Sequence, residues 1–178
     1  MIVFDLETTG LPYADGTELD KQPKIIELGA IKLDDDLKEI SRLEFFCNPG
    51  HELPPRITKI TGITDYMLED AKPFIAHYKE LCDFFLGERS LAAHNLSFDS
   101  RILRFELERI DKVTRFPWPP ENVCTLEISE KVWGGVKRKL GDIYEELFGN
   151  KIEGAHRAIN DVEATVKIIG WYNKEGHL

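Results

Sequence analysis

Two acidic residues directly follow an apolar run at the start of the chain. In residues 2–10 (IVFDLETTG), Asp5 and Glu7 come after three large apolar residues and before two threonines and a glycine. This pattern predicts a strand that runs into a turn. Side chains two apart in a strand point to the same face, so the two carboxylates should lie together. Buried like charges repel and are costly to desolvate, and a divalent cation is the simplest partner that would stabilise them.

The same two acids also fit a plainer explanation, as a capping or surface pair in an acidic chain. Two other close pairs, Glu18 with Asp20 and Asp34 with Asp36, lie in polar surroundings and are expected to be solvated loop acids. Only the apolar run before Asp5 sets the first pair apart. On the pattern alone, both interpretations stay open.

A third acid stands where a short apolar strand should meet a helix. In residues 93–99 (AHNLSFD), Asp99 falls in the expected first helical turn. The helix dipole favours a carboxylate there with or without a metal. Asn95 could likewise form only a turn with its own backbone. This segment therefore indicates a helix start and is compatible with a metal ligand.

A histidine and a fourth acid precede and enter the last expected helix, in residues 155–161 (AHRAIND). His156 and Asp161 are five apart, so on a helix they would not share a face. They could converge only if His156 belongs to the preceding loop, which Gly154 makes feasible. The alternative for Asp161 is a solvated residue that flanks the apolar stripe of the helix.

Composition restricts the possible classes of protein. The chain has 178 residues, 42% hydrophobic and 31% charged, which predicts one globular domain over residues 1–178. No apolar run approaches a membrane span, and Asp5 and Glu7 interrupt the only N-terminal one, so we expect neither a signal peptide nor membrane association. Three widely spaced cysteines, without a CxxC motif, indicate reduced thiols and a cytoplasmic protein.

The net charge of −9 argues against a protein that coats long nucleic acids. It does not exclude an enzyme that grips a few nucleotides, because bound divalent ions allow an acidic site to accept phosphate. Basic residues cluster twice, and solvated surface charge is the expected explanation for each cluster, although the pattern leaves their role open. The clusters are Arg101, Arg104 and Arg109, and Lys137, Arg138 and Lys139.

Hydrophobic periodicity and turn residues give the expected order of elements. Three closely spaced strands should form an antiparallel meander, and helices alternate with short strands after it. The expected strands are residues 2–10, 24–33, 42–47, 91–93 and 123–124; the expected helices are 54–60, 64–69, 73–86, 97–110 with Ser97 as its cap, a segment ending near 133, 140–148 and 157–172. This order predicts an α/β domain whose mixed sheet is flanked by helices.

Taken in order, the motifs DxE, HNxxFD and HxxxxD resemble those of the DEDD superfamily of 3′–5′ exonucleases. The resemblance is to its DEDDh branch, which includes proofreading subunits of bacterial DNA polymerase III and ribonuclease T. The three motifs extend from Asp5 to Asp161, nearly the whole chain. Residues 8–11 (TTGL), 60–64 (ITGIT) and 140–149 (LGDIYEELFG) match further. Thr61 departs from the pattern, because several members carry histidine there. The resemblance implies a ribonuclease H-like sheet, antiparallel in its first three strands and then parallel.

The resemblance also implies the chemistry of the site. Four carboxylates would hold two divalent ions, and oxygen-only ligands suit Mg²⁺ or Mn²⁺ better than zinc. Histidine exchanges a proton near neutral pH and would act as general base on the attacking water. The implied metal ligands are Asp5, Glu7, Asp99 and Asp161, and the implied base is His156.

Substrate contacts carry over from the family less directly. Thr8, Thr9 and Leu11 would border the terminal nucleotide, and Asn95 and Phe98 would line the same pocket from the other side. A phenylalanine can stack on a base without reading its sequence. Ordinary core packing is the alternative for Phe98 and Leu11.

The function implied is metal-dependent removal of nucleoside 5′-monophosphates from single-stranded 3′ ends, with DNA favoured over RNA. An exoribonuclease of the ribonuclease T or oligoribonuclease type is the alternative substrate class. A DNA polymerase is a further implied partner, although the chain ends just after the last helix, which favours a free-standing exonuclease.

Two unrelated functions compete with this one. Phosphatases of the haloacid dehalogenase type also place an Asp-x-acid pair after a first strand, but they need a later lysine and a terminal acid pair that this chain lacks. A non-catalytic module that binds nucleic acid or polymerase would not need all four acids and the histidine.

Overall fold

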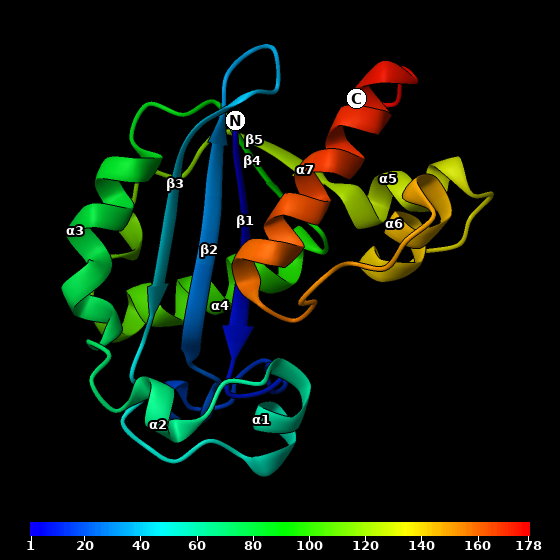
Figure 1. The fold of residues 1–178 in the computed structure, drawn as a ribbon. Helices are drawn as coiled ribbons and strands as arrows, with labels where there is room; N and C mark the ends of the chain where they lie inside the picture. Colours follow the sequence, from blue (N-terminus) through cyan, green and yellow to red (C-terminus); the bar gives the residue numbers. More distant parts are fainter.

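The computed structural model describes residues 1–178 and is built on a five-stranded mixed sheet with the strand order β3-β2-β1-β4-β5 (Figure 1). β1 pairs antiparallel with β2, and β2 with β3, whereas β1–β4 and β4–β5 are parallel. The predicted meander and mixed sheet are therefore confirmed. The strands are β1 (Ile2–Thr8), β2 (Ile25–Leu33), β3 (Glu39–Phe46), β4 (Ser90–Ala93) and β5 (Glu121–Cys124).

Helices cover both faces of this sheet. Alternate residues of β1, such as Ile2 and Phe4, face a core shared with α3 and α4, while Val3 faces Val162 and Ile169 of α7 on the opposite side. α1 and α2 lie beyond the end of β1, and α6 lies beside α7 (Figure 1). The helices are α1 (Pro55–Thr61), α2 (Asp65–Leu68), α3 (Phe74–Phe85), α4 (Leu96–Arg109), α5 (Thr125–Val132), α6 (Leu140–Phe148) and α7 (Ala158–Lys174), with short 3₁₀ turns at Leu19–Lys21 and Val113–Arg115.

The structure corrects two predicted boundaries. Ser97 is not the cap of α4: the helix begins at Leu96, and Asn95 precedes it in the left-handed conformation with φ of 76°. Ser97 instead donates its hydroxyl to Asn95 Oδ1 at 3.2 Å. β3 begins at Glu39 rather than Arg42, because backbone pairing with β2 continues through three exposed residues, of which only Ile40 is apolar.

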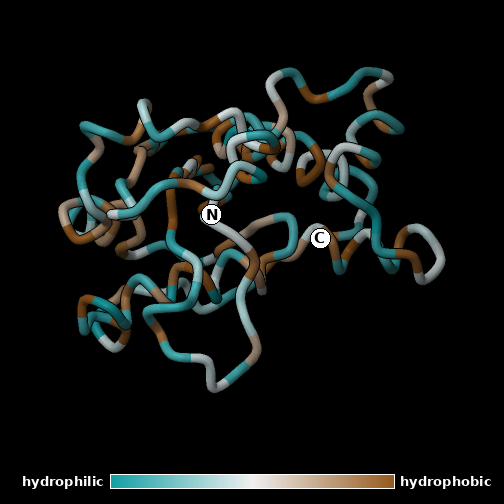
Figure 2. Tube along the Cα trace, turned by 90° about the horizontal axis from the view of Figure 1, so that it is seen from below, coloured by the Kyte–Doolittle hydropathy of each residue, from teal (hydrophilic) through white to brown (hydrophobic).

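Hydrophobic stretches are short and are interrupted by polar ones along the whole trace (Figure 2). No helix combines the length and the apolar character that crossing a bilayer would require.

The first turn of α7 lies directly on Gly29 of β2. A Cβ atom at position 29 would lie 2.6 Å from the backbone nitrogen of Ile159 and 2.8 Å from the carbonyl carbon of Ala158. Backbone cannot yield as a flexible side chain can. The absence of a side chain at position 29 therefore sets how closely the start of α7 approaches the sheet.

Gly29→Ala should lower the free energy of unfolding by about 1–3 kcal/mol, because the added methyl group overpacks a rigid contact. Gly170→Ala is the matched control: Gly170 lies within α7 and an added Cβ meets nothing within 4 Å. That control should be neutral or up to about 1 kcal/mol stabilising, since alanine favours helix. Urea unfolding of both variants measures the difference, and equal stabilities would contradict the contact.

Candidate active site

Acids from β1 and α7 meet on one face of the sheet. Asp5 and Glu7 share the face of β1 that Val3 presents to α7, opposite the core formed with α3 and α4. Asp161 lies in the first turn of α7. Ligand atoms of Glu7, Asp161 and His156 all lie within 4.8 Å of one another. Residues more than 150 positions apart in the chain are thus brought to one place by the contact of α7 with the sheet.

Asp99 reaches the same region from the first turn of α4. Its side chain is 2% exposed, and Oδ1 accepts a hydrogen bond from the Leu6 backbone nitrogen at 3.2 Å. Leu6 lies between Asp5 and Glu7 on β1. This bond places the buried Asp99 carboxylate against the strand that carries the first two acids.

The acids are buried close enough to perturb one another strongly. Burial, followed by repulsion from Asp161 and Glu27, holds the pKa of Asp5 well above its usual range. Burial and the charge of Asp5 do the same to the pKa of Asp99. Burial and neighbouring acids raise the pKa of Glu7 from 4.5 to about 9. The cluster therefore lacks the positive charge that its ionised form requires.

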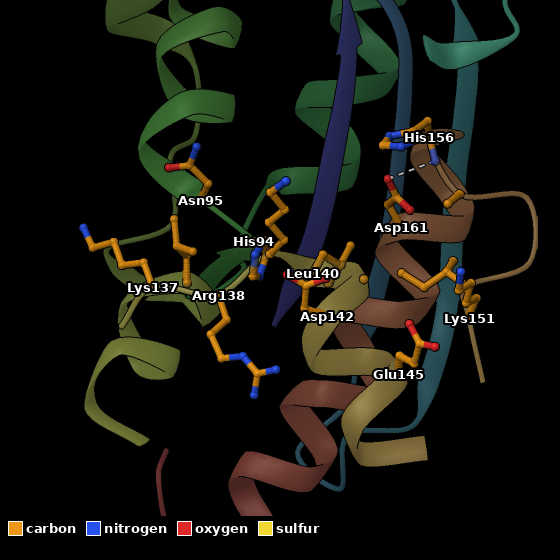
Figure 3. A pocket seen from close by; sticks show the side chains of 15 residues that line it. His94, Asn95, Lys137, Arg138, Leu140, Asp142, Glu145, Lys151, His156 and Asp161 are labelled. Atoms are coloured by element: carbon orange, nitrogen blue, oxygen red, sulfur yellow. Dashed lines mark hydrogen bonds between the residues drawn. The ribbon is translucent and has the colours of Figure 1, made fainter. Parts of the chain in front are cut away.

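His156 lies in the loop before α7, as its convergence with Asp161 requires. It adopts a left-handed backbone conformation with φ of 65°, and its backbone nitrogen donates to Asp161 Oδ2 at 3.3 Å (Figure 3). Asn160 supports the loop by donating to the Gly154 carbonyl at 2.8 Å. The imidazole itself is exposed, and Asp161 Oδ1 is buried without a hydrogen-bond partner. An unpartnered carboxylate oxygen among other acids fits a cation ligand.

An ion pair between buried Glu27 and half-buried Arg157, which the sequence did not predict, positions the start of α7. Glu27 of β2 is 5% exposed and lies opposite Glu7 in the β1–β2 register. Its carboxylate accepts from the Arg157 guanidinium at 2.8–3.2 Å and from the Ala158 backbone nitrogen at 3.0 Å. The only sequence signal was an acid within the apolar run of residues 25–31 (IIELGAI). Glu27 and Arg157 thus attach the helix that carries Asp161 directly to the sheet.

A cavity of about 340 Å³ borders Glu7. Its walls come from the end of β1 and the following loop, from α1 and from α4, and they include Thr8, Thr9, Leu11, Ile57, Ile60 and Phe98. The Thr8 hydroxyl donates to the Gly10 carbonyl at 2.7 Å, and Thr9 Oγ1 accepts from the Lys24 nitrogen at 3.0 Å, so both shape the loop. Leu11 is 70% exposed, which excludes the core-packing alternative for that residue.

A larger cavity of about 730 Å³ borders Asp161 and His156. Figure 3 shows Asn95, Lys137 and Arg138 on one side of it, with His156 and Asp161 on the other. The family resemblance implies that Asn95 and Phe98 line one pocket. In the structure, Asn95 lines this larger cavity and Phe98 lines the smaller one, because the left-handed conformation of Asn95 sets it apart from the helix that follows.

Within the first basic cluster, Arg109 is bonded to the protein rather than freely solvated. Arg109 donates to the backbone carbonyls of Leu19, Gln22 and Pro23, and pairs with Glu106 at 3.1 Å. Arg101 contacts Asp15, and Arg104 lies over the Trp118 ring. Arg109 and Arg101 bond to the loop before β2, so the expectation of solvated charge is wrong for Arg109, whereas Arg104 is exposed. His94 is likewise held in place, with Nδ1 2.9 Å from Thr125 Oγ1.

Comparison with known proteins identifies the family. The family model of the RNase T type, described as exonuclease, matches residues 2–169. The chain belongs to this exonuclease family. It is 33% identical over 168 residues to the PolC-type DNA polymerase III of Bacillus subtilis, covering 94% of this chain but 11% of that protein. It is 32% identical over 177 residues to the PolC-type DNA polymerase III of Streptococcus pyogenes, again covering 11% of the relative.

Solved structures show the same fold for this exonuclease-family chain. The nuclease domain of 3′hExo, a DEDDh family member bound to rAMP, superposes with a TM-score of 0.76 at 19% identity, covering 98% of this chain and 92% of that one. Escherichia coli exonuclease I in complex with a dA16 oligonucleotide gives a TM-score of 0.78 at 19% identity, covering 97% of this chain and 40% of that one. The predicted ribonuclease H-like α/β fold and the DEDDh resemblance are confirmed.

Proposed function

We propose that this exonuclease-family chain is a metal-dependent 3′–5′ exonuclease that releases nucleoside 5′-monophosphates from single-stranded ends, DNA in preference to RNA. One observation carries the proposal: Glu7 of β1 and Asp161 of α7 have ligand atoms within 4.8 Å of His156, and each lines one of the two cavities. Asp99 of α4 adds a buried carboxylate bonded to Leu6, between Asp5 and Glu7 on β1. A cluster of acids with raised pKa values, next to a space for a substrate, is typical of a catalytic site.

Asp5, Glu7, Asp99 and Asp161 would hold two divalent ions. The donor set is carboxylate oxygen, which suits Mg²⁺ or Mn²⁺. The free Oδ1 of Asp161 and the unbalanced charge of the buried cluster both fit such ions. When bound, a pair of such ions activates water and stabilises the leaving oxygen.

His156 would take the proton of the attacking water as general base. Water oxygen bonds to phosphorus, the bond from phosphorus to the upstream 3′ oxygen breaks, and that oxygen takes a proton from solvent water to become the new 3′ hydroxyl. The terminal nucleotide leaves as its 5′-monophosphate. Exposure of the imidazole, with its backbone fixed to Asp161, supports this role because the ring can approach a substrate while the loop stays in place.

The smaller cavity would hold the terminal nucleoside. It adjoins Glu7. The partly buried Phe98 ring, which also packs against the main core, and the exposed Leu11 side chain offer apolar surface to a base. Thr8 and Thr9 shape the wall, and Asn95 would contact the substrate from the larger cavity. A DNA polymerase is a proposed partner, supported by the names of the PolC-type relatives.

A 5′-labelled single-stranded oligonucleotide incubated with Mn²⁺ tests the proposal. We expect stepwise shortening from the 3′ end, release of 5′-monophosphates and complete inhibition by EDTA. A matched RNA oligonucleotide, measured in parallel, decides between deoxyribonuclease and exoribonuclease. Intact DNA and RNA in the presence of Mn²⁺ or Mg²⁺ would favour a non-catalytic binding module and overturn the proposal.

In EDTA, the stability of the protein should fall as pH rises. Folded Glu7 keeps its proton up to a pKa of about 9, whereas the unfolded carboxyl loses it near 4.5. Between these values the folded state binds more protons, so the free energy of unfolding decreases by up to about 1.4 kcal/mol per pH unit from this group.

Urea unfolding in EDTA at pH 5, 7 and 8.5 measures this trend. Mn²⁺ should stabilise the protein increasingly over the same range, since its ligands must be ionised. The Glu7→Gln variant is the control and should show a weaker dependence on pH. A free energy of unfolding in EDTA that rises from pH 5 to 8.5 would contradict the prediction.

A further inference from the structure

The larger cavity is distinct in shape and charge from the smaller one. At about 730 Å³ it has roughly twice the volume of the 340 Å³ cavity beside Glu7. Its walls come from the residues after β4, from the loop before α6 with the start of that helix, and from the segment before α7 (Figure 3). Four basic side chains line it, namely Lys137, Arg138, Lys139 and Lys151, whereas Arg56 is the only one in the smaller cavity.

These basic side chains differ in how firmly they are already paired. Arg138 pairs with Glu146 and lies over the Trp133 ring, so it stabilises the α5–α6 connection. Lys137 makes an exposed contact of 3.7 Å with Glu130. Lys139 is exposed and, like Lys151, forms no ion pair. Two acids of α6, Asp142 and Glu145, also line the cavity and face the same space.

The two cavities meet at the acid cluster. Glu7 belongs to the wall of the smaller one, and Asp161 and His156 to the wall of the larger one, with their ligand atoms within 4.8 Å of one another. A phosphodiester at this junction has one nucleoside on each side. The smaller cavity, with its apolar walls, suits a single terminal nucleoside. The other side must accept a continuing chain with a negative charge at every nucleotide.

A protein of net charge −9 needs local cations to accept such a chain. We propose that the larger cavity binds the nucleotides on the 5′ side of the scissile phosphate, with Lys139 and Lys137 neutralising their phosphates. This inference rests on the proposed function and adds the direction in which the strand crosses the site. The 3′ nucleoside lies beside Thr8, Thr9 and Phe98, and the remaining strand extends past Asn95 toward the loop before α6.

Substrate length provides the test. The p-nitrophenyl ester of thymidine 5′-monophosphate places its nucleoside in the smaller cavity and its phosphate at the junction. Its uncharged nitrophenyl leaving group takes the place of the upstream strand and carries no further phosphate. A single-stranded DNA of 12 nucleotides also fills the larger cavity. Lys139→Glu should raise KM for the DNA about 10-fold, and this increase should be at least five times larger than the increase in KM for the ester. The substitution should also reduce the dependence of KM for the DNA on salt. Lys137→Glu should act in the same direction.

Lys174→Glu is the matched control, because Lys174 is exposed at the end of α7 and lines neither cavity. It makes the same charge change and should leave both substrates unaffected. If Lys139→Glu raises KM equally for the ester and the DNA, or raises it for neither, the strand path is wrong while the proposed function stays intact. A wild-type protein inactive on both substrates would instead overturn the proposed function.

Discussion

Replacing Asp99 with asparagine should lower turnover on single-stranded DNA by about 1,000-fold or more while preserving the fold. The carboxylate is 2% exposed and accepts from Leu6, a hydrogen bond that the asparagine carbonyl can also accept. The substitution therefore removes charge with little change of shape. Removing a single preorganised electrostatic group from an active site costs about 100- to 1,000-fold, and an ion ligand is expected to lie at the upper end.

The same variant should be at least as stable as the wild type in EDTA. Burial and Asp5 hold the pKa of Asp99 well above its usual range, which means that the ionised form is destabilising in the folded protein without a cation. The measurements are turnover, Mn²⁺ titration and urea unfolding in EDTA. Asp70→Asn, at an exposed position of the turn after α2, is the control. Near-normal turnover of Asp99→Asn would exclude Asp99 as an essential ligand.

His156→Ala should lose about 100- to 10,000-fold in kcat while Mn²⁺ affinity changes little. The bond from position 156 to Asp161 comes from the backbone nitrogen, so it does not need the imidazole. The side chain supplies the proton acceptor, and the backbone supplies the geometry. A loss of turnover without a loss of Mn²⁺ affinity would therefore indicate a general base, whereas a loss of both would indicate a metal ligand.

The conformation of this residue requires a second variant. With φ of 65°, alanine at position 156 carries a backbone strain that asparagine tolerates better. His156→Asn should thus retain the loop conformation and still lose turnover. The control is His51→Ala, at an exposed position outside both cavities, which should keep the turnover of the wild type. If either His156 variant cuts DNA as fast as the wild type, the general-base assignment is wrong.

Local patterns in the sequence predicted most of the fold. Alternating apolar residues and turns located β1, β2 and the antiparallel meander, since these signals depend on near neighbours in the chain. The cap of α4 was wrong because serine is a common cap, whereas the observed start depends on the left-handed backbone of Asn95. The early start of β3 was missed because strand pairing, rather than side-chain character, extends it to Glu39.

The site was harder to predict, because convergence is a tertiary property. Spacing could place Asp5 beside Glu7, but only the family resemblance related them to Asp99 and Asp161. The contacts that bring these four acids together gave almost no recognisable pattern in the sequence. Gly29 resembled any glycine in a strand, and the pairing of Glu27 with Arg157 joins residues 130 positions apart.

The attachment of α7 to β2 has a consequence for how this protein can diversify. Glu27 holds the start of the helix through Arg157 and the Ala158 nitrogen, so the sheet fixes the start of α7 through residues that follow His156. The connection between α6 and α7 can therefore vary in length and composition upstream of His156 without displacing an acid of the cluster. Because that connection contributes Lys151, Ile152 and Ala155 to the larger cavity, natural or laboratory evolution could alter substrate range there while the chemistry stays constant.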